Sequence, residues 1–300
     1  MDYSLSEIRA YNAIVKCGNF SRAAEKLNVS QPAVTAQIRK LESRFEYPLL
    51  ERFSKGVIPT ELGKRLYHLS CQYEDLDKAI DVLANPDKHL GNVTLKVATA
   101  STLVFMPLIA QFRQRFPDVT LKLISAPTAE CCDLLLKREV DIALCPMRDD
   151  LKGVSKLPFH THSLVAIIPL THPLAQCSEV SFEQLSRESL IYSRPFTCTQ
   201  SVVDDYFNHL NLQPNTSIVM DNRQEICEAV AYNLGIGFVL ENDIHSDPRF
   251  CIRPIKEVDN AVEEHVSWLK NRSVLPGIKD FVQQALELRC HSDGSLSFTS

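Results

Sequence analysis

The chain has 300 residues, of which 45% are hydrophobic and 23% are charged, and its net charge is −5. At roughly 100 to 200 residues per domain, this length predicts two or three globular domains with sizeable cores. The sequence contains no apolar run of about 18 residues and no basic start followed by an apolar core, so we expect neither a membrane span nor a secretory signal. We therefore expect a cytoplasmic protein.

Ten cysteines are scattered along the chain without a Cys-x-x-Cys pair. This spacing favours reduced, packed thiols over a disulfide framework or a zinc site, and we predict no metal and no cofactor. Cys131-Cys132 lies in an apolar helical run and is interpreted as packing, whereas Cys198 leaves a redox-sensor role open. The nearby histidines of His160-Thr161-His162 are interpreted as polar surface residues because no third ligand has a matching spacing.

Charge is distributed unevenly along the chain. Residues 1 to 65 contain eleven Lys or Arg and seven Asp or Glu, a net charge of +4, so the total of −5 leaves −9 for the other 235 residues. A basic segment on an acidic body predicts a polyanionic partner for the N-terminal part alone.

The stretch "SRAAEKLNVSQPAVTAQIRKLE" predicts two short helices joined by a tight turn. Ser30 is a predicted N-cap, and Pro32 follows in the first turn, where its missing N–H costs little. Val34, Ile38 and Leu41 form the buried stripe of the second helix. Its opposite face predicts base contacts from Gln31 and Thr35 and phosphate contacts from basic residues further along, as expected for the second helix of a helix-turn-helix. A surface helical hairpin in an unrelated protein is the alternative.

Residues 20–42 and the following "PLLERFSKGVIPTELGKRL" resemble the N-terminal domain of LysR-type transcriptional regulators. The resemblance covers about the first 65 residues and rests on the SQPA and QIRKLE runs and on the PLxER wing pattern. It implies a winged helix-turn-helix in which Arg52 of the wing reaches toward the minor groove. Ala36 stands where many members have arginine, which implies fewer direct base contacts. The residues predicted to contact DNA are Ser30, Gln31, Pro32, Thr35, Arg39, Lys40, Arg52 and Lys55.

Residues 60–84 predict one long helix. Apolar residues repeat along it with alternating spacings of four and three, as in a coiled-coil seam: Leu62, Leu66, Leu69, Tyr73, Leu76, Ile80 and Leu83. Such a seam predicts pairing with a second copy of the chain, the alternative being a helix that lies on its own domain. A dimer would place two recognition helices on a dyad-like DNA site. "NPDKHLGN", residues 85–92, predicts a hinge.

After the hinge, strand-like and helix-like runs alternate. Strands are predicted at 93–99, 119–125, 140–145, 164–168, 190–192, 217–220, 237–240 and 265–269. This order predicts two α/β lobes around a cleft, similar to the effector domain of LysR-type regulators, which resembles periplasmic binding proteins. The overall fold class is α/β. We expect domain limits of 1–60 (winged helix-turn-helix), 61–90 (linker helix and hinge), 91–290 (effector domain) and 291–300 (flexible tail). Lobe I is expected at about 91–160 and 265–290, and lobe II at about 161–264.

Residues that follow the predicted carboxyl ends of the strands, most of them polar, are candidates to line the cleft. They are Ser101, Thr102, Thr128, Pro146, Met147, Arg194, Phe196, Thr197, Thr199, Asp221 and Arg223. The family's cleft is lined from matching positions, most clearly at Ser101, Thr102 and Thr128, although these hydroxyls could also serve as helix caps. The mixture of arginine and aspartate predicts an anionic or zwitterionic effector, unless the arginines pair with Asp221.

The sequence shows no phosphate loop, no nucleophile elbow and no acid–base set, so we do not expect an enzyme. We predict a LysR-type regulator in the bacterial nucleoid, with double-stranded DNA, a small effector, further copies of the chain as a dimer or tetramer, and RNA polymerase as partners. The alternatives are a cytoplasmic small-molecule binding protein and an α/β enzyme with an accessory DNA-binding domain.

Overall fold

The computed structural model describes residues 3–54, 56–84, 93–147, 151–195, 197–259 and 262–292. The chain divides into two compact units, residues 1–88 and 89–300. Within the described residues no helix is both long and apolar enough to cross a bilayer. The predicted hinge at 85–92 and the last eight residues lie outside the described part of the chain.

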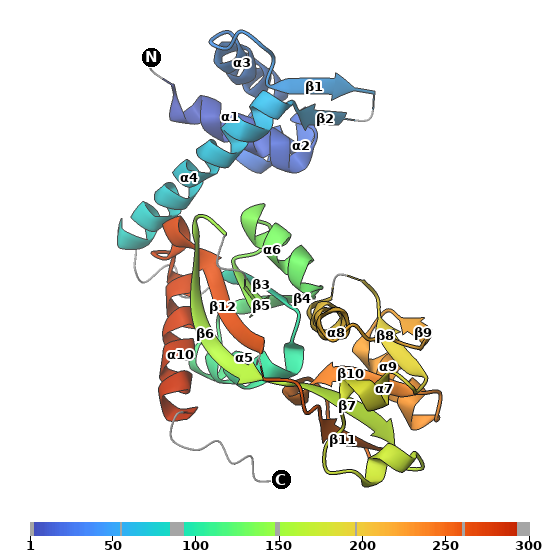
Figure 1. Ribbon diagram of the computed structural model, residues 1–300. Helices are drawn as coiled ribbons and strands as arrows, with labels where there is room; N and C mark the ends of the chain where they lie inside the picture. The colour runs from blue at the N-terminus through green and yellow to red at the C-terminus, as the bar shows by residue number, and fades with distance from the viewer. Residues whose placement is uncertain are drawn as a thin grey trace. The chain divides into compact units, whose positions relative to one another are not determined.

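The N-terminal unit is a small helical domain with a two-stranded wing (Figure 1). Its elements in chain order are α1 (Leu5–Cys17), α2 (Phe20–Leu27), α3 (Gln31–Glu42), β1 (Leu50–Phe53), β2 (Gly56–Pro59) and α4 (Glu61–Ala84). β1 and β2 pair antiparallel, with Leu50 opposite Pro59. Ser30 caps α3 as predicted, by accepting a hydrogen bond from the N–H of Ala33. Thr60 caps α4 in the same way, by accepting from the N–H of Gly63.

A buried carboxylate joins the first and third helices. Glu7 on α1 accepts hydrogen bonds from Arg44, with Nη1 at 2.6 Å, and lies 3.2 Å from Lys40 Nζ. Burial would raise the pKa of Glu7, but the hydrogen bonds from Lys40 and from the N–H of Ser4, together with the Arg44 charge, lower it. Glu7 therefore stays ionised and fixes the position of the C-terminal half of α3 relative to α1.

Helix α4 turns a polar face toward α1 and an apolar face toward solvent. Buried Asn12 accepts a hydrogen bond from Ser70 at 2.5 Å, and the ion pairs Arg9–Asp77 and Lys16–Glu74 continue the contact along both helices. Within the predicted seam, Leu62 and Leu66 pack against the domain core. Four seam residues further along are more than half exposed: Leu69, Tyr73, Leu76 and Ile80. Leu83 lies in α4, but its side chain is outside the described part.

The C-terminal unit contains two five-stranded mixed sheets. The first has the order β4-β3-β5-β12-β6 and the second β11-β7-β10-β8-β9. The strands of the first sheet are β3 (Thr94–Thr99), β4 (Thr120–Ser125), β5 (Ile142–Pro146), β6 (Val154–His162) and β12 (Val262–Leu269). Those of the second are β7 (Leu164–Pro169), β8 (Leu190–Ser193), β9 (Thr216–Met220), β10 (Ile236–Leu240) and β11 (Phe250–Pro254).

Helices flank the first sheet on both faces (Figure 1). On one face α6 (Thr128–Leu136) packs on Ala98 and Ala143. On the other, α10 (Pro276–Ser292) begins against Val93 and Leu95 and packs on α5 (Thr102–Arg115), with the rings of Phe112 and Phe281 5.0 Å apart. The second sheet is accompanied by α7 (Phe182–Leu185), α8 (Cys198–His209) and α9 (Arg223–Ala231), and short 3-10 turns lie at Pro173–Gln176, Glu241–Asp243 and Lys270–Arg272.

The predicted strands are all present, and the predicted return of the last strand and helix to the first sheet is confirmed. Two strands were not predicted, β6 and β11. β6 ends at His162 and β12 begins at Val262, two and three residues from the predicted limits of lobe I at 160 and 265. Three residues beside the crossovers are buried: His162, Glu264 and His265.

Gly63 marks the closest backbone approach in the N-terminal unit. A Cβ at this position would lie 2.1 Å from the carbonyl oxygen of Leu49 and 2.7 Å from the hydroxyl oxygen of Tyr11. We expect Gly63→Ala to lower the free energy of unfolding by about 1–3 kcal/mol, because the backbone of α4 must move away from these two oxygen atoms to make room for the added methyl group. His68→Ala, at an exposed position of the same helix, should change it by less than about 0.5 kcal/mol in the same denaturant titration. Equal stability of the two variants would contradict this packing.

Candidate functional site

Helix α3 is held by its apolar stripe. Val34, Ile38 and Leu41 are at most 1% exposed and belong to the same core as α1 and α2. The stripe fixes the rotation of α3 about its axis, so the opposite face must point to solvent. That face begins at the Ser30 cap, where the helix N-terminus favours negative charge.

The exposed face of α3 forms a shallow groove. Its lining residues are Gln31, Pro32, Thr35, Ala36, Arg39 and Lys40. Gln31 Oε1 accepts a weak hydrogen bond from Ser21 at 3.3 Å, and Thr35 Oγ1 donates to the Gln31 carbonyl oxygen. The side-chain amide of glutamine and the methyl group of threonine are the chemical groups that read adenine and thymine edges.

The basic residues predicted to contact phosphate differ in their surroundings. Arg39 is exposed. Lys40 is exposed as well but pairs with Glu7. The guanidinium of Arg52 on β1 stacks on the ring of Phe20, 4.6 Å from its centroid, which orients it at the base of the wing. Lys55 lies outside the described part of the chain.

In the C-terminal unit a cavity of about 470 Å³ opens between the two sheets. The carboxyl ends of β3, β4 and β5 border it from one side, and those of β8, β9 and β10 from the other. The predicted candidates that line it are Ser101, Thr128, Pro146, Arg194, Thr197, Thr199, Asp221 and Arg223. Residues from six strand ends thus meet in one cleft, as parallel strand order requires.

Not every predicted residue reaches this cleft. Thr102 and Met147 are absent from its lining. Met147 is buried, and its sulfur lies 3.5 Å from the Cys132 thiol. Phe196 lies outside the described part of the chain.

Four helices present their N-termini to the cleft. α5 and α6 begin at Thr102 and Thr128 in the first lobe, and α8 and α9 begin at Cys198 and Arg223 in the second. Unpaired N–H groups and aligned helix dipoles make such termini favourable for anions. Ser101 precedes α5 without a capping hydrogen bond from its side chain, so the capping alternative is not met for this residue. Thr197 caps α8 by accepting from the N–H of Gln200.

The two cleft arginines have different partners. Arg223 donates to Asp243 Oδ2 at 2.6 Å and to the carbonyl oxygen of the same residue at 3.2 Å. The expectation that a cleft arginine pairs with Asp221 is therefore not met for Arg223, which pairs with Asp243. Arg194 is exposed on the cleft wall, and within the described residues no carboxylate is paired with it. An anion in the cleft would find Arg194 free to bind it.

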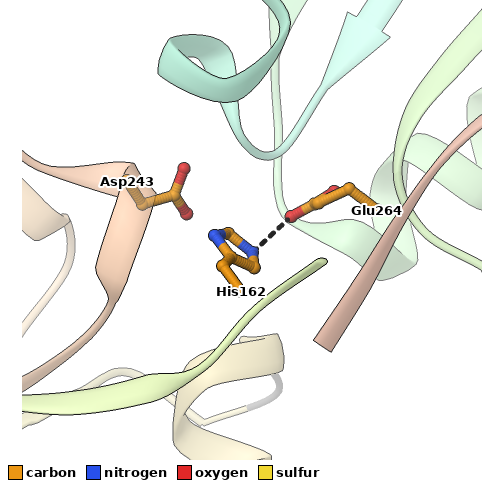
Figure 2. Close-up of side chains that lie close together, drawn as sticks. All are labelled: His162, Asp243 and Glu264. Carbon is orange, nitrogen blue, oxygen red and sulfur yellow. Dashed lines mark ion pairs between the residues drawn. The ribbon is translucent and has the colours of Figure 1, made fainter. Parts of the chain in front are cut away.

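The floor of the cleft is a buried polar cluster of Ser101, His162, Asp243 and Glu264. Ser101 Oγ donates to Glu264 Oε1 at 2.5 Å and faces Asp243 Oδ2 at 3.4 Å. Figure 2 shows the imidazole of His162 between the carboxyl groups of Asp243 and Glu264, with Nε2 3.3 Å from Glu264 Oε1. One imidazole nitrogen and one oxygen from each carboxyl group lie within 4.8 Å of one another, a set that could hold a metal ion.

Three of these residues were missed by sequence reasoning. His162 was expected on the surface but is only 2% exposed, so that expectation is wrong for this residue. Glu264 reaches the floor because β12 lies between β5 and β6, and Asp243 because it follows β10. No local pattern marks these positions, since Ser101 and Glu264 are separated by 163 residues.

Cys198 lines the same cleft. Burial, followed by the charges of Glu264 and Asp243, raises the pKa of its thiol to about 12. At neutral pH the group is therefore a protonated thiol, the less reactive form, which weakens the redox-sensor alternative. Cys131 on α6 is fully buried and donates to the carbonyl oxygen of Ala126, in agreement with its interpretation as a packing residue.

Comparisons with known proteins agree with this architecture. Residues 5–64 match the family described as "Bacterial regulatory helix-turn-helix protein, lysR family", and residues 89–289 match the family described as "LysR substrate binding domain". The transcriptional regulator CbbR of Sinorhizobium medicae is 31% identical over 294 residues, covering 94% of this chain and 92% of that protein. The RuBisCO operon transcriptional regulator of Allochromatium vinosum is 29% identical over 241 residues, covering 80% of each chain.

Among solved structures, a full-length OxyR variant from Pseudomonas aeruginosa has a TM-score of 0.78 and 22% identity, covering 95% of this chain and 98% of that one. This likeness shows a shared fold.

Proposed function

Because this chain belongs to the LysR family of transcriptional regulators, we propose that it reads a dyad-like DNA site with α3 and responds to a small anionic or zwitterionic effector in the cleft. One observation carries the proposal. α3 has exposed Gln31 and Arg39 and half-buried Thr35 on the face opposite a fully buried stripe, as a helix that enters the major groove requires. The relatives' names refer to different operons, so they support the class of function and not the target genes.

In the proposed complex the groups on α3 divide by role. Gln31 and Thr35, with Ser30 and Pro32 beside them, meet base edges, because they lie in the first turns of the helix. Arg39 and Lys40 lie further along and meet phosphates. Arg52, stacked on Phe20, reaches the minor groove beside the wing, and Lys55 adds a charge there.

Gln31→Ala should reduce discrimination at one base pair by about 1–3 kcal/mol, because a bidentate contact to adenine is lost. Arg39→Ala should weaken binding to operator and non-operator DNA alike. Gel-shift titrations at fixed salt measure both effects. Gln72→Ala, an exposed glutamine on α4, is the matched control and should leave both unchanged. Full operator discrimination by Gln31→Ala would show that this face of α3 does not read the bases.

We place the effector in the cleft because Arg194 and four helix N-termini converge there. A carboxylate or a similar oxyanion suits the wall, since Arg194 has no paired carboxylate among the described residues. The acidic floor lies behind Arg223, so a cationic group on the same effector would face Asp243 and Glu264. Closure of the two lobes on such a ligand would be the conformational change that switches the regulator between its states.

Arg194→Ala should weaken binding of an anionic effector, found by a thermal-shift screen of metabolites, by about 10-fold or more, as expected for loss of a charged hydrogen bond. Ser101→Ala combined with Thr128→Val should weaken it further. Arg187→Ala removes an exposed arginine that pairs with Glu183 outside the cleft and serves as the control. Unchanged titrations for Arg194→Ala and for the double variant would exclude the cleft as the sensing site.

We also propose that the exposed part of the seam pairs two copies of the chain. α4 uses polar contacts with Asn12, Arg9 and Lys16 to bind its own domain, which leaves Leu69, Tyr73, Leu76 and Ile80 in solvent. An apolar row of this length in water is stabilised by a matching helix. Assembly of two dimers through the C-terminal domains would give a tetramer.

Leu76→Asp with Ile80→Asp should dissociate the dimer, because each charge would be buried without a partner in the paired helices. Sedimentation of the full chain at micromolar concentration measures the change in mass. Val274→Asp is the control, since Val274 is similarly exposed on the C-terminal unit. A double variant with the mass of the unmodified chain would show that α4 is not the pairing surface.

We propose that the cleft binds its ligand without converting it. Ser101 Oγ donates to the carboxylate of Glu264, so it does not form the Ser–His pair of a serine hydrolase. This arrangement favours a sensor over an enzyme with an accessory DNA-binding domain. RNA polymerase is a proposed partner at the promoter, and the bacterial nucleoid is the proposed location.

A further inference from the structure

The cluster beneath the effector cleft contains more hydrogen-bonding capacity than its neighbours satisfy. His162, Asp243 and Glu264 are each at most 2% exposed. Both ring nitrogens of His162, together with Asp243 Oδ1 and Glu264 Oε2, are buried atoms without a hydrogen-bond partner among the described residues. The 3.3 Å contact between His162 and Glu264 is therefore a close approach that lacks hydrogen-bond geometry. Buried polar atoms that stay unpaired destabilise a fold by about 1–3 kcal/mol each, so a missing partner is indicated.

The charges of the cluster point to a cation. Two buried carboxylates face one guanidinium, that of Arg223, which is bound to Asp243. Burial raises the pKa of Asp243 although Arg223 and His162 lower it, and the neighbouring Glu264 raises it further. A positive charge between the carboxylates would offset both the desolvation and this mutual repulsion.

The hydrogen bonds within the cluster orient the two carboxylates so that one oxygen atom of each remains available to bind a metal ion. Ser101 donates to Oε1 of Glu264 and Arg223 donates to Oδ2 of Asp243, which leaves Oε2 and Oδ1 unengaged. Carboxylates that bind metals are commonly oriented by such outer hydrogen bonds. The second histidine of the strand, His160, lies edge-on to His162 with the ring centroids 5.5 Å apart, and its Nε2 is also buried without a partner in the described residues.

The size of the site favours a bare ion over a larger group. Ligand atoms about 2.0–2.1 Å from a tetrahedral ion lie about 3.4 Å apart. The His162–Glu264 separation is 3.3 Å and no separation within the set exceeds 4.8 Å, so rotation of Asp243 or Glu264 would complete the geometry. The unpartnered atoms of the three side chains are buried from water.

We propose that His162, Asp243 and Glu264 bind a divalent transition-metal ion, such as Zn²⁺, at the floor of the effector cleft. One imidazole and two carboxylates form a nitrogen and oxygen donor set of the kind that suits Zn²⁺, Fe²⁺ and Mn²⁺. Asp243 and Glu264 both border the cleft, which is the path by which the ion enters.

The site joins the two lobes. His162 ends β6 and Glu264 lies on β12, both strands of the first sheet, whereas Asp243 follows β10 of the second sheet. An ion held by all three would connect the lobes next to the crossovers. It would therefore stabilise one relative placement of the lobes, whichever effector occupies the cleft.

The test uses the full chain, freed of metal with a chelator and titrated with Co²⁺ and then with Zn²⁺. The visible absorption of bound Co²⁺ reports its donor atoms, and competition with a chromogenic chelator measures Zn²⁺ affinity. We expect one tight ion per chain, a Co²⁺ spectrum without near-ultraviolet thiolate bands, and a rise in melting temperature with Zn²⁺. Glu264→Gln and Asp243→Asn should each weaken Zn²⁺ binding by at least about 100-fold, the upper end of the loss seen when only an outer partner is removed.

Glu188→Gln is the matched control. Glu188 also lies 3.3 Å from a histidine nitrogen, that of His172, but this pair is partly exposed. The control should bind Zn²⁺ as the unmodified chain does. The proposal is overturned if the unmodified chain shows no stoichiometric Co²⁺ spectrum, if thiolate bands place the ion on cysteines, or if folded Glu264→Gln and Asp243→Asn both retain full affinity.

Discussion

The insertion of β12 between β5 and β6 is the constraint on which the C-terminal unit depends. β12 runs antiparallel to both neighbours and completes the first sheet after the chain has built the whole second sheet. Because the chain must leave and re-enter the first sheet, two crossovers lie side by side, and the cleft forms beside them. The same register carries Glu264 to the cleft floor opposite His160 of β6, next to His162. The lobes, the cleft and its buried charges thus depend on one strand placement.

The strands that the sequence predicts most directly are those in a uniformly apolar environment. β7 and β10 are buried along their full length and read as continuous runs of hydrophobic residues. β6 and β11 lack this signal. β6 carries Lys156, Pro158 and two histidines, and most of its residues are only partly buried. β11 includes Arg253 and ends in proline. Both are edge strands, whose pairing is decided by neighbours far away in the chain and not by a local pattern.

In the cleft, the sequence predicts the residues that follow the carboxyl ends of parallel strands. It misses Glu264, whose position depends on how β12 pairs with its neighbours. The carboxyl ends of parallel strands meet at one edge, which is why Ser101, Thr128 and Arg194 could be placed together from the sequence alone. Glu264 lies on an antiparallel strand and does not obey that rule, whereas Asp243 follows the carboxyl end of β10 in a 3-10 turn and was overlooked. The identity of the ion-pair partner of Arg223 also depends on three-dimensional placement. Asp221 is two residues away, yet the guanidinium binds Asp243.

Arg223 lies between the wall of the cleft, which favours anions, and its acidic floor. It begins α9 at the wall, where an anion is favoured, and its guanidinium neutralises Asp243 at the floor. An anionic ligand that draws Arg223 toward itself removes the partner of a buried carboxylate, and leaving such a charge unpaired costs several kcal/mol. The cost falls if another cation takes the place of Arg223 or if Asp243 gains a proton. Binding at the wall and the charge state of the floor are therefore linked through one side chain, and by thermodynamic reciprocity a change at either place alters the affinity at the other.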